Sequence, residues 1–323
     1  MPATASSPLD FVHALAHGIH VIDTGFHRPR FDAAYLMVEG GRAAFIDTGT
    51  THSVPRLLSA LGSLGLQTDA VDWVIVTHVH LDHAGGAGAL MQALPHARLV
   101  VHPRGERHMV NPSALLAGAR AVYGADEVAR SYGEVPPIAA ERVHTSRDGE
   151  SIQLAGRALQ LIDTPGHARH HHCIWDARSR GFFTGDTFGL SYREFDTARG
   201  PWLLPTTTPV QFDPEPLRQS VRRMLSYAPE RMYLTHYGCV DGVPALGNMM
   251  LEQIDELVAL AEPLRHASDR HVRLRNGLTE IYLKRVREHG CTLPDAETLS
   301  LLASDIELNA QGLAVWLDGD KPK

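Results

Sequence analysis

Three histidines and one aspartate fall within the six residues HVHLDH at positions 78–83. His78 and His80 are two residues apart, so both side chains can face one ion if the preceding strand continues through them. Asp82 and His83 follow at the expected turn into a helix, where they can hold a second ion. Imidazole nitrogens and a carboxylate, with no thiolate in the motif, suit zinc, iron, manganese or cobalt. The spacing therefore predicts a metal centre with room for two ions.

Three later strand ends carry the remaining candidate ligands. His167 closes the segment DTPGH, Asp186 lies in TGDT, and His236 lies in LTHYG. A single histidine at a strand end is commonly a hydrogen-bonded structural residue. In this order after the first cluster, however, the set reaches five histidines and two aspartates. That number is enough for two ions with a position left open for substrate.

This combination resembles the metallo-β-lactamase-fold hydrolase superfamily. The resemblance rests on the HxHxDH motif, the TPGH segment, the GD segment and the late strand-terminal histidine, and it spans residues 18–240. It implies an α/β fold, a four-layer αββα sandwich with the metals at one edge of its two sheets. It also implies a ligand set: His78, His80 and His167 for the first ion, Asp82, His83 and His236 for the second, and Asp186 as the bridge between them.

The resemblance assigns a role to one further aspartate. Asp47, in FIDTG, matches an early strand-end aspartate of the family that orients a ligand histidine by hydrogen bonding without touching metal. The expected cofactors are two divalent ions, with zinc first and iron or manganese as alternatives. Such a pair lowers the pKa of a bridging water, so that hydroxide can attack a small ester, lactone, thioester or phosphoester. Asp82 would pass a proton to the leaving group, which makes it the candidate catalytic residue.

Other functions remain compatible with the motif. A mononuclear iron dioxygenase acting on a persulfide keeps much of it, and so does a non-catalytic binding protein, although seven filled ligand positions disfavour the latter. Lactonases of the superfamily often carry a tyrosine three residues after the bridging aspartate, where this chain has Gly189. Glyoxalase II relatives append helices to the same core, but the tail here has no basic cluster that we can assign to glutathione.

Five further residues are candidate substrate contacts. Two of them lie close in sequence to a predicted ligand histidine. The others lie in residues 188–212, a long stretch without strand signals, and such stretches in compact domains are often functional. The candidates are His170, Tyr192, Arg193, Trp202 and Tyr237.

The elements that position these residues follow from hydrophobic patterning. Short apolar runs that end in turns predict strands at 20–25, 33–49, 71–78, 97–103, 158–167, 181–188 and 231–238, with a hairpin turn at Gly40-Gly41. Helical spacing predicts helices at 53–65 and 87–95, and a third after Asp213 with Leu217, Val221 and Met224 on one face.

From about residue 243 onward the strand signals stop. Helices are expected at 244–267, 269–289 and 295–317, which divides the chain into a catalytic domain (1–242) and a helical extension (243–323). The extension either covers the sheet and completes its core, or covers substrate, or forms a homodimer.

Composition restricts the remaining functions. Thirty lysines and arginines against 37 acidic residues give a net charge of −7, which disfavours nucleic-acid partners. No apolar run is long enough to cross a membrane, and no basic residue precedes an apolar stretch at the start, so neither a membrane nor a secretory signal is expected. Three widely spaced cysteines fit reduced thiols in the cytoplasm. A small molecule is the expected partner.

Overall fold

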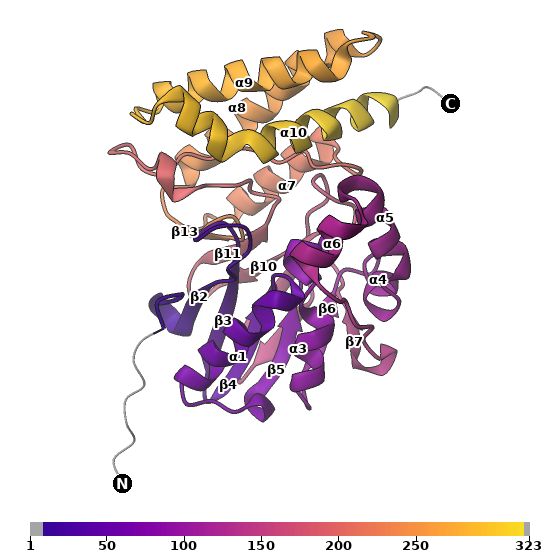
Figure 1. Cartoon of the computed structure of the whole chain (residues 1–323). Coiled ribbons are helices and arrows are strands. Elements are labelled where there is room, and N and C mark those ends of the chain that lie inside the picture. Colours follow the sequence, from indigo (N-terminus) through magenta and orange to yellow (C-terminus); the bar gives the residue numbers. More distant parts are fainter. Residues whose placement is uncertain (1–8, 320–323) are drawn as a thin grey trace.

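The structure is a computed structural model, and it describes residues 9–319. Two sheets face each other, and helices cover the outer face of each (Figure 1). The expected four-layer αββα sandwich is therefore confirmed.

The first sheet contains seven strands that follow one another in chain order. Its first four strands are antiparallel and the remaining three continue in parallel. Gly40 and Gly41 have φ angles of 53° and 77°, as a two-residue hairpin turn between strands requires, so the predicted hairpin is confirmed. The strands are β1 (Val12–Ala14), β2 (Ile19–Asp23), β3 (Ala33–Glu39), β4 (Arg42–Ile46), β5 (Val71–Ile75), β6 (Arg98–Val101) and β7 (Val143–Thr145).

The second sheet contains six strands in the order β13-β12-β11-β10-β9-β8. All of its neighbouring strands are antiparallel except β11 and β12. The strands are β8 (Ser151–Leu154), β9 (Arg157–Asp163), β10 (His172–Asp176), β11 (Gly181–Gly185), β12 (Arg231–Leu234) and β13 (Gly238–Val240).

Side chains alternate between the middle of the sandwich and its outer layers. Tyr35 on β3 and Tyr233 on β12 lie in the cluster between the two sheets. Their neighbours Leu36 and Met232 point the opposite way, into the two outer clusters. Because successive strand residues face opposite sides, strands buried on both faces read as nearly continuous apolar runs.

The outer layers are helical. The first sheet is covered by α1 (Val54–Ser63), α2 (Leu81–Ala84) and α3 (Ala87–Ala93), and the second by α7 (Pro214–Ser226). Helix α7 starts as predicted, because the Asp213 side chain accepts a hydrogen bond from the Glu215 N–H at 3.3 Å. Its predicted face, Leu217, Val221 and Met224, is buried.

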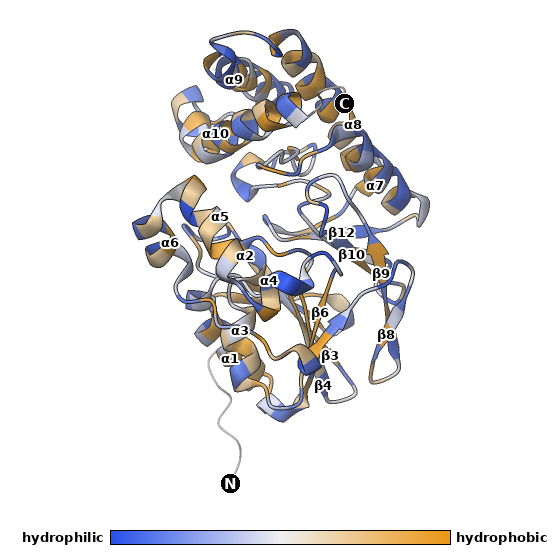
Figure 2. Ribbon diagram, turned by 90° about the vertical axis from the view of Figure 1, so that its right-hand side faces the viewer, coloured by the Kyte–Doolittle hydropathy of each residue, from blue (hydrophilic) through white to orange (hydrophobic). Residues whose placement is uncertain are grey.

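The last three helices are α8 (Val243–Ala261), α9 (Arg270–Glu288) and α10 (Asp295–Gly319). Hydrophobic and hydrophilic residues alternate along all three helices (Figure 2), and each helix buries apolar residues. Leu257, Leu278 and Leu313, one from each helix, belong to the same buried cluster as Met232 on β12. The helices therefore complete the core on the outer face of the second sheet.

Three helices, α4 (Glu106–Val110), α5 (Ser113–Tyr123) and α6 (Ala125–Tyr132), lie between β6 and β7 in a stretch where no element was expected. Short 3-10 segments complete the described chain: η1 (Ala16–Gly18), η2 (Thr51–Ser53), η3 (Thr68–Ala70), η4 (Ala140–Arg142), η5 (Arg193–Phe195) and η6 (Glu262–Leu264). Among the described helices, none combines the length and the apolar character that a membrane crossing needs.

Candidate metal centre

The strand expected at 71–78 is shorter than predicted, which changes how the first histidines are positioned. Strand β5 ends at Ile75, so His78 and His80 do not share a strand face. The chain leaves the sheet because Asp47, at the end of β4, accepts hydrogen bonds from the Thr77 N–H at 2.8 Å and from its hydroxyl at 2.9 Å. The two histidines converge from a loop that Asp47 holds in place.

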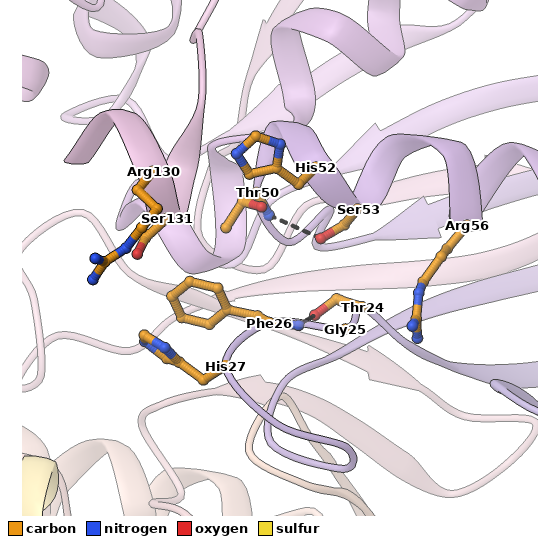
Figure 3. Close-up of a pocket in the computed structure, with 10 residues that line it drawn as sticks. All are labelled: Thr24, Gly25, Phe26, His27, Thr50, His52, Ser53, Arg56, Arg130 and Ser131. Atoms are coloured by element: carbon orange, nitrogen blue, oxygen red, sulfur yellow. Dashed lines mark hydrogen bonds between the residues drawn. The ribbon is translucent and has the colours of Figure 1, made fainter. Parts of the chain in front are cut away.

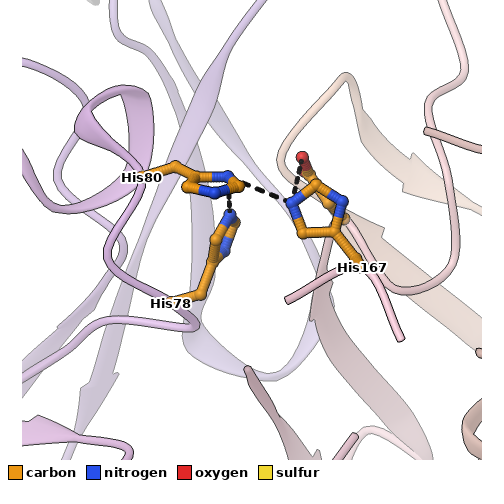
Figure 4. Close-up of side chains that lie close together, drawn as sticks. His78, His80 and His167 are labelled. Carbon is orange, nitrogen blue, oxygen red and sulfur yellow. Dashed lines mark hydrogen bonds and ion pairs between the residues drawn. The ribbon is translucent and has the colours of Figure 1, made fainter. Parts of the chain in front are cut away.

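The first group consists of three histidines from two segments. His78 Nε2 lies 2.9 Å from His80 Nδ1, and His167 Nε2 lies 3.1 Å from the same atom (Figure 4). His78 and His167 are fully or almost fully buried. The loop after β5 and the loop after β9 thus bring three imidazole nitrogens to one point, together with a carboxylate of Asp186.

The second group consists of Asp82, His83 and His236. Asp82 Oδ2 lies 3.7 Å from His83 Nε2 and 3.4 Å from His236 Nε2. Asp82 and His83 lie on the short helix α2, and His236 follows β12, so this group also joins the two halves of the sandwich.

Asp186 lies between the two groups and directs one oxygen toward each. Its Oδ2 is 3.5 Å from His167 Nε2, in the first group. Its Oδ1 is 3.3 Å from His83 Nε2 and 3.8 Å from His236 Nε2, in the second. A carboxylate in this position can bridge two ions.

These residues fit two divalent ions. Ligand atoms about 2.0–2.2 Å from a tetrahedral ion lie about 3.3 Å from one another, which is close to the separations in both groups. His83 Nε2 and Asp186 Oδ1 are buried and form no hydrogen bond among the described residues, so both atoms are free to bind a cation. The donors are nitrogen and oxygen atoms, as zinc, iron and manganese accept.

Asp47 orients the second group, as the resemblance implies. Its Oδ2 accepts a hydrogen bond from His83 Nδ1 at 2.9 Å, which leaves His83 Nε2 directed at the metal site. The Thr235 hydroxyl donates to the same oxygen at 3.0 Å. Asp47 itself has a φ of 54°, a left-handed conformation that is uncommon outside glycine and is found at functional sites.

Several supporting residues had no signal of their own in the sequence. The Phe31 carbonyl accepts a hydrogen bond from His236 Nδ1 at 2.8 Å, and Thr77 and Thr235 hold Asp47. His171 Nε2 lies 3.3 Å from the Asp186 backbone N–H, so it supports the bridging residue. Only His171 was in a recognisable pattern, the run of histidines after His167.

The metal-free protein distributes protons unequally between the two groups. Burial lowers the pKa of all three histidines of the first group, to about 3 for His80. These imidazoles are therefore neutral at pH 7 and ready to bind a cation.

The second group behaves in the opposite way. Burial disfavours protonation of His83 and His236, but the carboxylates of Asp186 and Asp82 outweigh it. The pKa of His83 is raised well above its usual range and that of His236 to about 9. Burial also disfavours ionisation of the two carboxyls, yet the neighbouring histidines hold their pKa values well below the usual range. Without metal, this group consists of charged pairs.

Of the five expected substrate contacts, one lies directly beside the metal centre. The His170 ring is parallel to that of His78 at 6.2 Å and is 5.6 Å from that of His80. Tyr237 adjoins His236 in sequence, but its side chain is buried in the cluster between the sheets, where burial raises its pKa to about 12.

The aromatic residues of the loop at 188–212 do not line an open surface. Tyr192 is 0% exposed and Trp202 is 1% exposed. Trp202 packs edge-on against Phe195 at 5.2 Å, within the cluster beneath the last three helices. Arg193 donates to the Ser191 carbonyl at 2.7 Å. Tyr192 and Trp202 pack the loop against the helical extension, whereas the Arg193 side chain is 21% exposed and stays a candidate contact.

A pocket of about 320 Å³ opens near the second group (Figure 3). One of its residues, His27, is close enough to Asp82 and His236 for its pKa to respond to both, although burial has the larger, lowering effect. Its two arginines are already paired, Arg56 with Asp23 and Arg130 with Glu127. It is lined by Thr24, Gly25, Phe26, His27, Thr50, His52, Ser53, Arg56, Arg130 and Ser131.

Comparison with known proteins supports the same family throughout. The metallo-beta-lactamase fold-containing protein ST1585 of Sulfurisphaera tokodaii is 27% identical over 228 residues, 69% of this chain and 79% of that protein. The crystal structure of ST1585 from Sulfolobus tokodaii matches with a TM-score of 0.65 at 23% identity, over 93% of this chain and 99% of that chain.

Two other similar proteins have names that describe an activity or a metal state. The acyl-coenzyme A thioesterase MBLAC2 of Gallus gallus is 30% identical over 194 residues, 54% of this chain and 65% of that protein. A structure of the peroxy diiron species of the chemotaxis sensor ODP matches with a TM-score of 0.52 at 17% identity, over 74% of this chain and 93% of that chain. The latter likeness shows the fold alone.

The family model of the metallo-beta-lactamase superfamily matches residues 27–236, which include every residue of both metal-binding groups. That match covers well over half of the chain, and the chain therefore belongs to the metallo-beta-lactamase superfamily.

Proposed function

We propose that this chain is a dinuclear metal-dependent hydrolase that cleaves a small ester, thioester or phosphoester. The observation that carries the proposal is the position of Asp186. Its two oxygens face two separate groups, 3.5 Å from His167 Nε2 and 3.3 Å from His83 Nε2. A single-ion enzyme would not need a complete second group of Asp82, His83 and His236.

Different residues of the chain would have different roles in hydrolysis. When bound, two divalent ions supply a water of lowered pKa and polarise the oxygen of the bond to be cleaved. Asp47 holds His83 in the orientation that binding requires. The Asp82 side chain is 25% exposed whereas that of His83 is fully buried, so Asp82 is the group that can pass a proton to a leaving group at the mouth of the site.

The substrate classes are not equally supported. A lactone is disfavoured because a Cβ at position 189 would overlap the Leu204 carbonyl oxygen, so no tyrosine fits there. A thioester is favoured by the name of the chicken relative, an acyl-coenzyme A thioesterase. We therefore place thioesters first among the candidate substrates.

Activity should be tested with zinc-loaded protein under argon, using an aryl ester, an acyl thioester and a phosphotriester. We expect turnover that needs no oxygen. His80→Ala and Asp186→Ala should lose turnover and bound metal while keeping the wild-type circular dichroism spectrum. His96→Ala is the matched control, because His96 is exposed and belongs to neither group. Full turnover with full metal content in the Asp186 variant would overturn the proposal.

Iron content and oxygen consumption distinguish the alternative function, a mononuclear iron dioxygenase. A mononuclear iron dioxygenase would contain one iron per chain, would consume oxygen with a persulfide substrate, and would be inactive toward all three test compounds under argon.

A further inference from the structure

Three arginines beside the first metal-binding group have no acidic partner. Arg104 precedes α4, Arg107 lies on it, and Arg169 follows the ligand His167 by two residues. All three are exposed, and none forms an ion pair with a residue in the described part of the chain. We call Arg104, Arg107 and Arg169 the arginine rim.

Contacts join two members of the rim to each other and to the site. Arg104 Nη1 lies 3.5 Å from the Arg169 carbonyl oxygen, so the two residues are neighbours although 65 positions apart. Arg169 is followed directly by His170, whose ring lies 5.6 Å from that of His80. His170 therefore connects Arg169 to the first metal-binding group.

The third member, Arg107, lies three residues after Arg104, on helix α4. Arg107 Nε donates to His108 Nε2 at 3.2 Å. His170 Nδ1 is buried and has no hydrogen-bond partner, so a polar atom beside the metal centre is still available on this side.

Neighbouring acidic groups form no ion pair with the rim among the described residues. The pKa of Asp163 is lowered mainly by its hydrogen bond to His102 Nε2, at 3.2 Å, and less by Arg104. Glu106, on the same helix as Arg107, forms no ion pair among the described residues. The arginines of the pocket in Figure 3 differ from the rim, because Arg56 and Arg130 both have carboxylate partners.

Unpaired guanidinium groups attract and orient anions. In a protein of net charge −7, Arg104 and Arg169, which are in contact beside the first metal-binding group, favour a local positive field. The planar fork of arginine matches the oxygens of a phosphate or a carboxylate, which it binds in a bidentate manner. The rim is therefore suited to an anionic part of a substrate whose reacting bond lies at the metal centre.

We propose that the arginine rim binds a phosphate or carboxylate group on the alcohol or thiol portion of the substrate. This inference rests on the proposed hydrolase function for its reacting bond, but binding of the anion can be measured separately. Its role is to select substrates by charge and to position them, without participating in bond cleavage.

Binding should be measured with thioethers that cannot be hydrolysed: S-methyl pantetheine, which is neutral, its 4′-phosphate, and S-methyl glutathione, which carries carboxylates. Calorimetric titration of the metal-loaded protein should show at least tenfold tighter binding of one anionic thioether than of the neutral one. In the double variant Arg104→Gln/Arg169→Gln that preference should fall to less than threefold. Arg98→Gln is the matched control, because Arg98 is exposed and unpaired at the opposite end of β6.

The pattern of results identifies the anion and can refute the proposal. A preference for the phosphate compound alone assigns a phosphate site, and a preference for glutathione alone assigns a carboxylate site. Equal binding of all three compounds, or a preference that survives in the double variant, would overturn the proposal.

Turnover separates this inference from the proposed function. With acetyl thioesters of the same three thiols, we expect the double variant to raise KM for the anionic substrate at least tenfold and to change kcat less than twofold. If anionic thioethers bind through the rim but no thioester, aryl ester or phosphotriester is cleaved, the proposed function fails and the anion site stands. If all thioesters are cleaved equally by wild type and double variant, the function stands and the anion site fails.

Discussion

The Tyr192 hydroxyl donates a hydrogen bond to Asp305 Oδ1 at 3.1 Å, which connects the last helix to the loop beneath the metal centre. The Tyr192 ring stacks on Phe31 with centroids 5.4 Å apart. The Phe31 carbonyl in turn accepts the hydrogen bond of His236 Nδ1. Helix α10 thus reaches a predicted metal ligand through two intervening residues, so the helical extension supports the site as well as the core.

This connection includes a buried acid whose ionisation opposes folding. Burial raises the pKa of Asp305 to about 6. A raised carboxyl pKa gives stability that is fully present below the unfolded pKa of about 4 and is lost as pH rises through about 6. Asp305→Asn keeps an acceptor for Tyr192 and removes the charge. We expect it to be more stable than wild type at pH 8 by about 1–3 kcal/mol, and by about half as much at pH 5, which lies midway between the two pKa values.

Urea unfolding at the two pH values measures this difference. Asp241→Asn, at an exposed position, is the control and should change stability by less than about 0.5 kcal/mol. If the Asp305 variant is destabilised equally at both pH values, burial does not disfavour ionisation of the Asp305 carboxyl group.

A second prediction concerns Asp47. Asparagine, unlike most residue types, tolerates the left-handed backbone at this position, so Asp47→Asn should fold. It replaces the carboxylate that accepts the His83 and Thr235 hydrogen bonds. We expect affinity for the second ion to fall about 10–100-fold, with a smaller effect on the first. Competition with a chelator measures both constants, and unchanged affinity for both ions would contradict the assigned role.

The two ions should bind with different pH dependence. The histidines of the first group have lowered pKa values, so binding there displaces no proton near neutral pH. In the second group the pKa of His236 is about 9 and that of His83 is also raised, so an ion must displace their protons below that pH. Between pH 6.5 and 8.5, affinity for the second ion should rise about tenfold or more per pH unit. The same slope for both ions would disprove the unequal protonation.

A fourth prediction tests the packing of the last helix. A Cβ at Gly312 would overlap the Thr207 carbonyl oxygen, and the adjoining Thr207 N–H donates to Asn309 Oδ1 at 2.6 Å. Gly312→Ala should therefore destabilise the protein by about 1–3 kcal/mol. Gly118→Ala is the matched control: it is also helical but faces open space, and should stabilise by about 0.5–1 kcal/mol. A destabilised control, or a neutral Gly312 variant, would contradict this account.

The candidate metal-binding groups of the structure consist of the residues predicted from sequence, because these residues lie in short motifs that follow strands. His78, His167 and His236 are far apart in the chain, but parallel and antiparallel strands bring their ends to one edge of the sandwich. The course of the chain through His78 and His80 was not predictable. Beyond Ile75 the Thr77 N–H donates to Asp47, 30 positions earlier in the chain, whereas the local apolar pattern continues past that point.

The roles of the loop residues Tyr192 and Trp202 could also not be predicted from the sequence. An aromatic residue in a long loop looks the same whether it lines a cleft or packs against a helix. Trp202 packs against Tyr282, 80 positions away in sequence, and Tyr192 bonds to Asp305, 113 positions away. The arginine rim likewise depends on the contact between Arg104 and Arg169, which neighbouring residues do not indicate.

The most direct test of the dinuclear assignment is the ratio of metal to protein chain at saturation. Protein dialysed free of metal and titrated with zinc should take up two ions per chain, measured by elemental analysis after removal of free zinc. This ratio follows from the position of Asp186 between two complete groups. Saturation at one ion per chain would contradict the account, because the second group and the bridging role of Asp186 would then have no function.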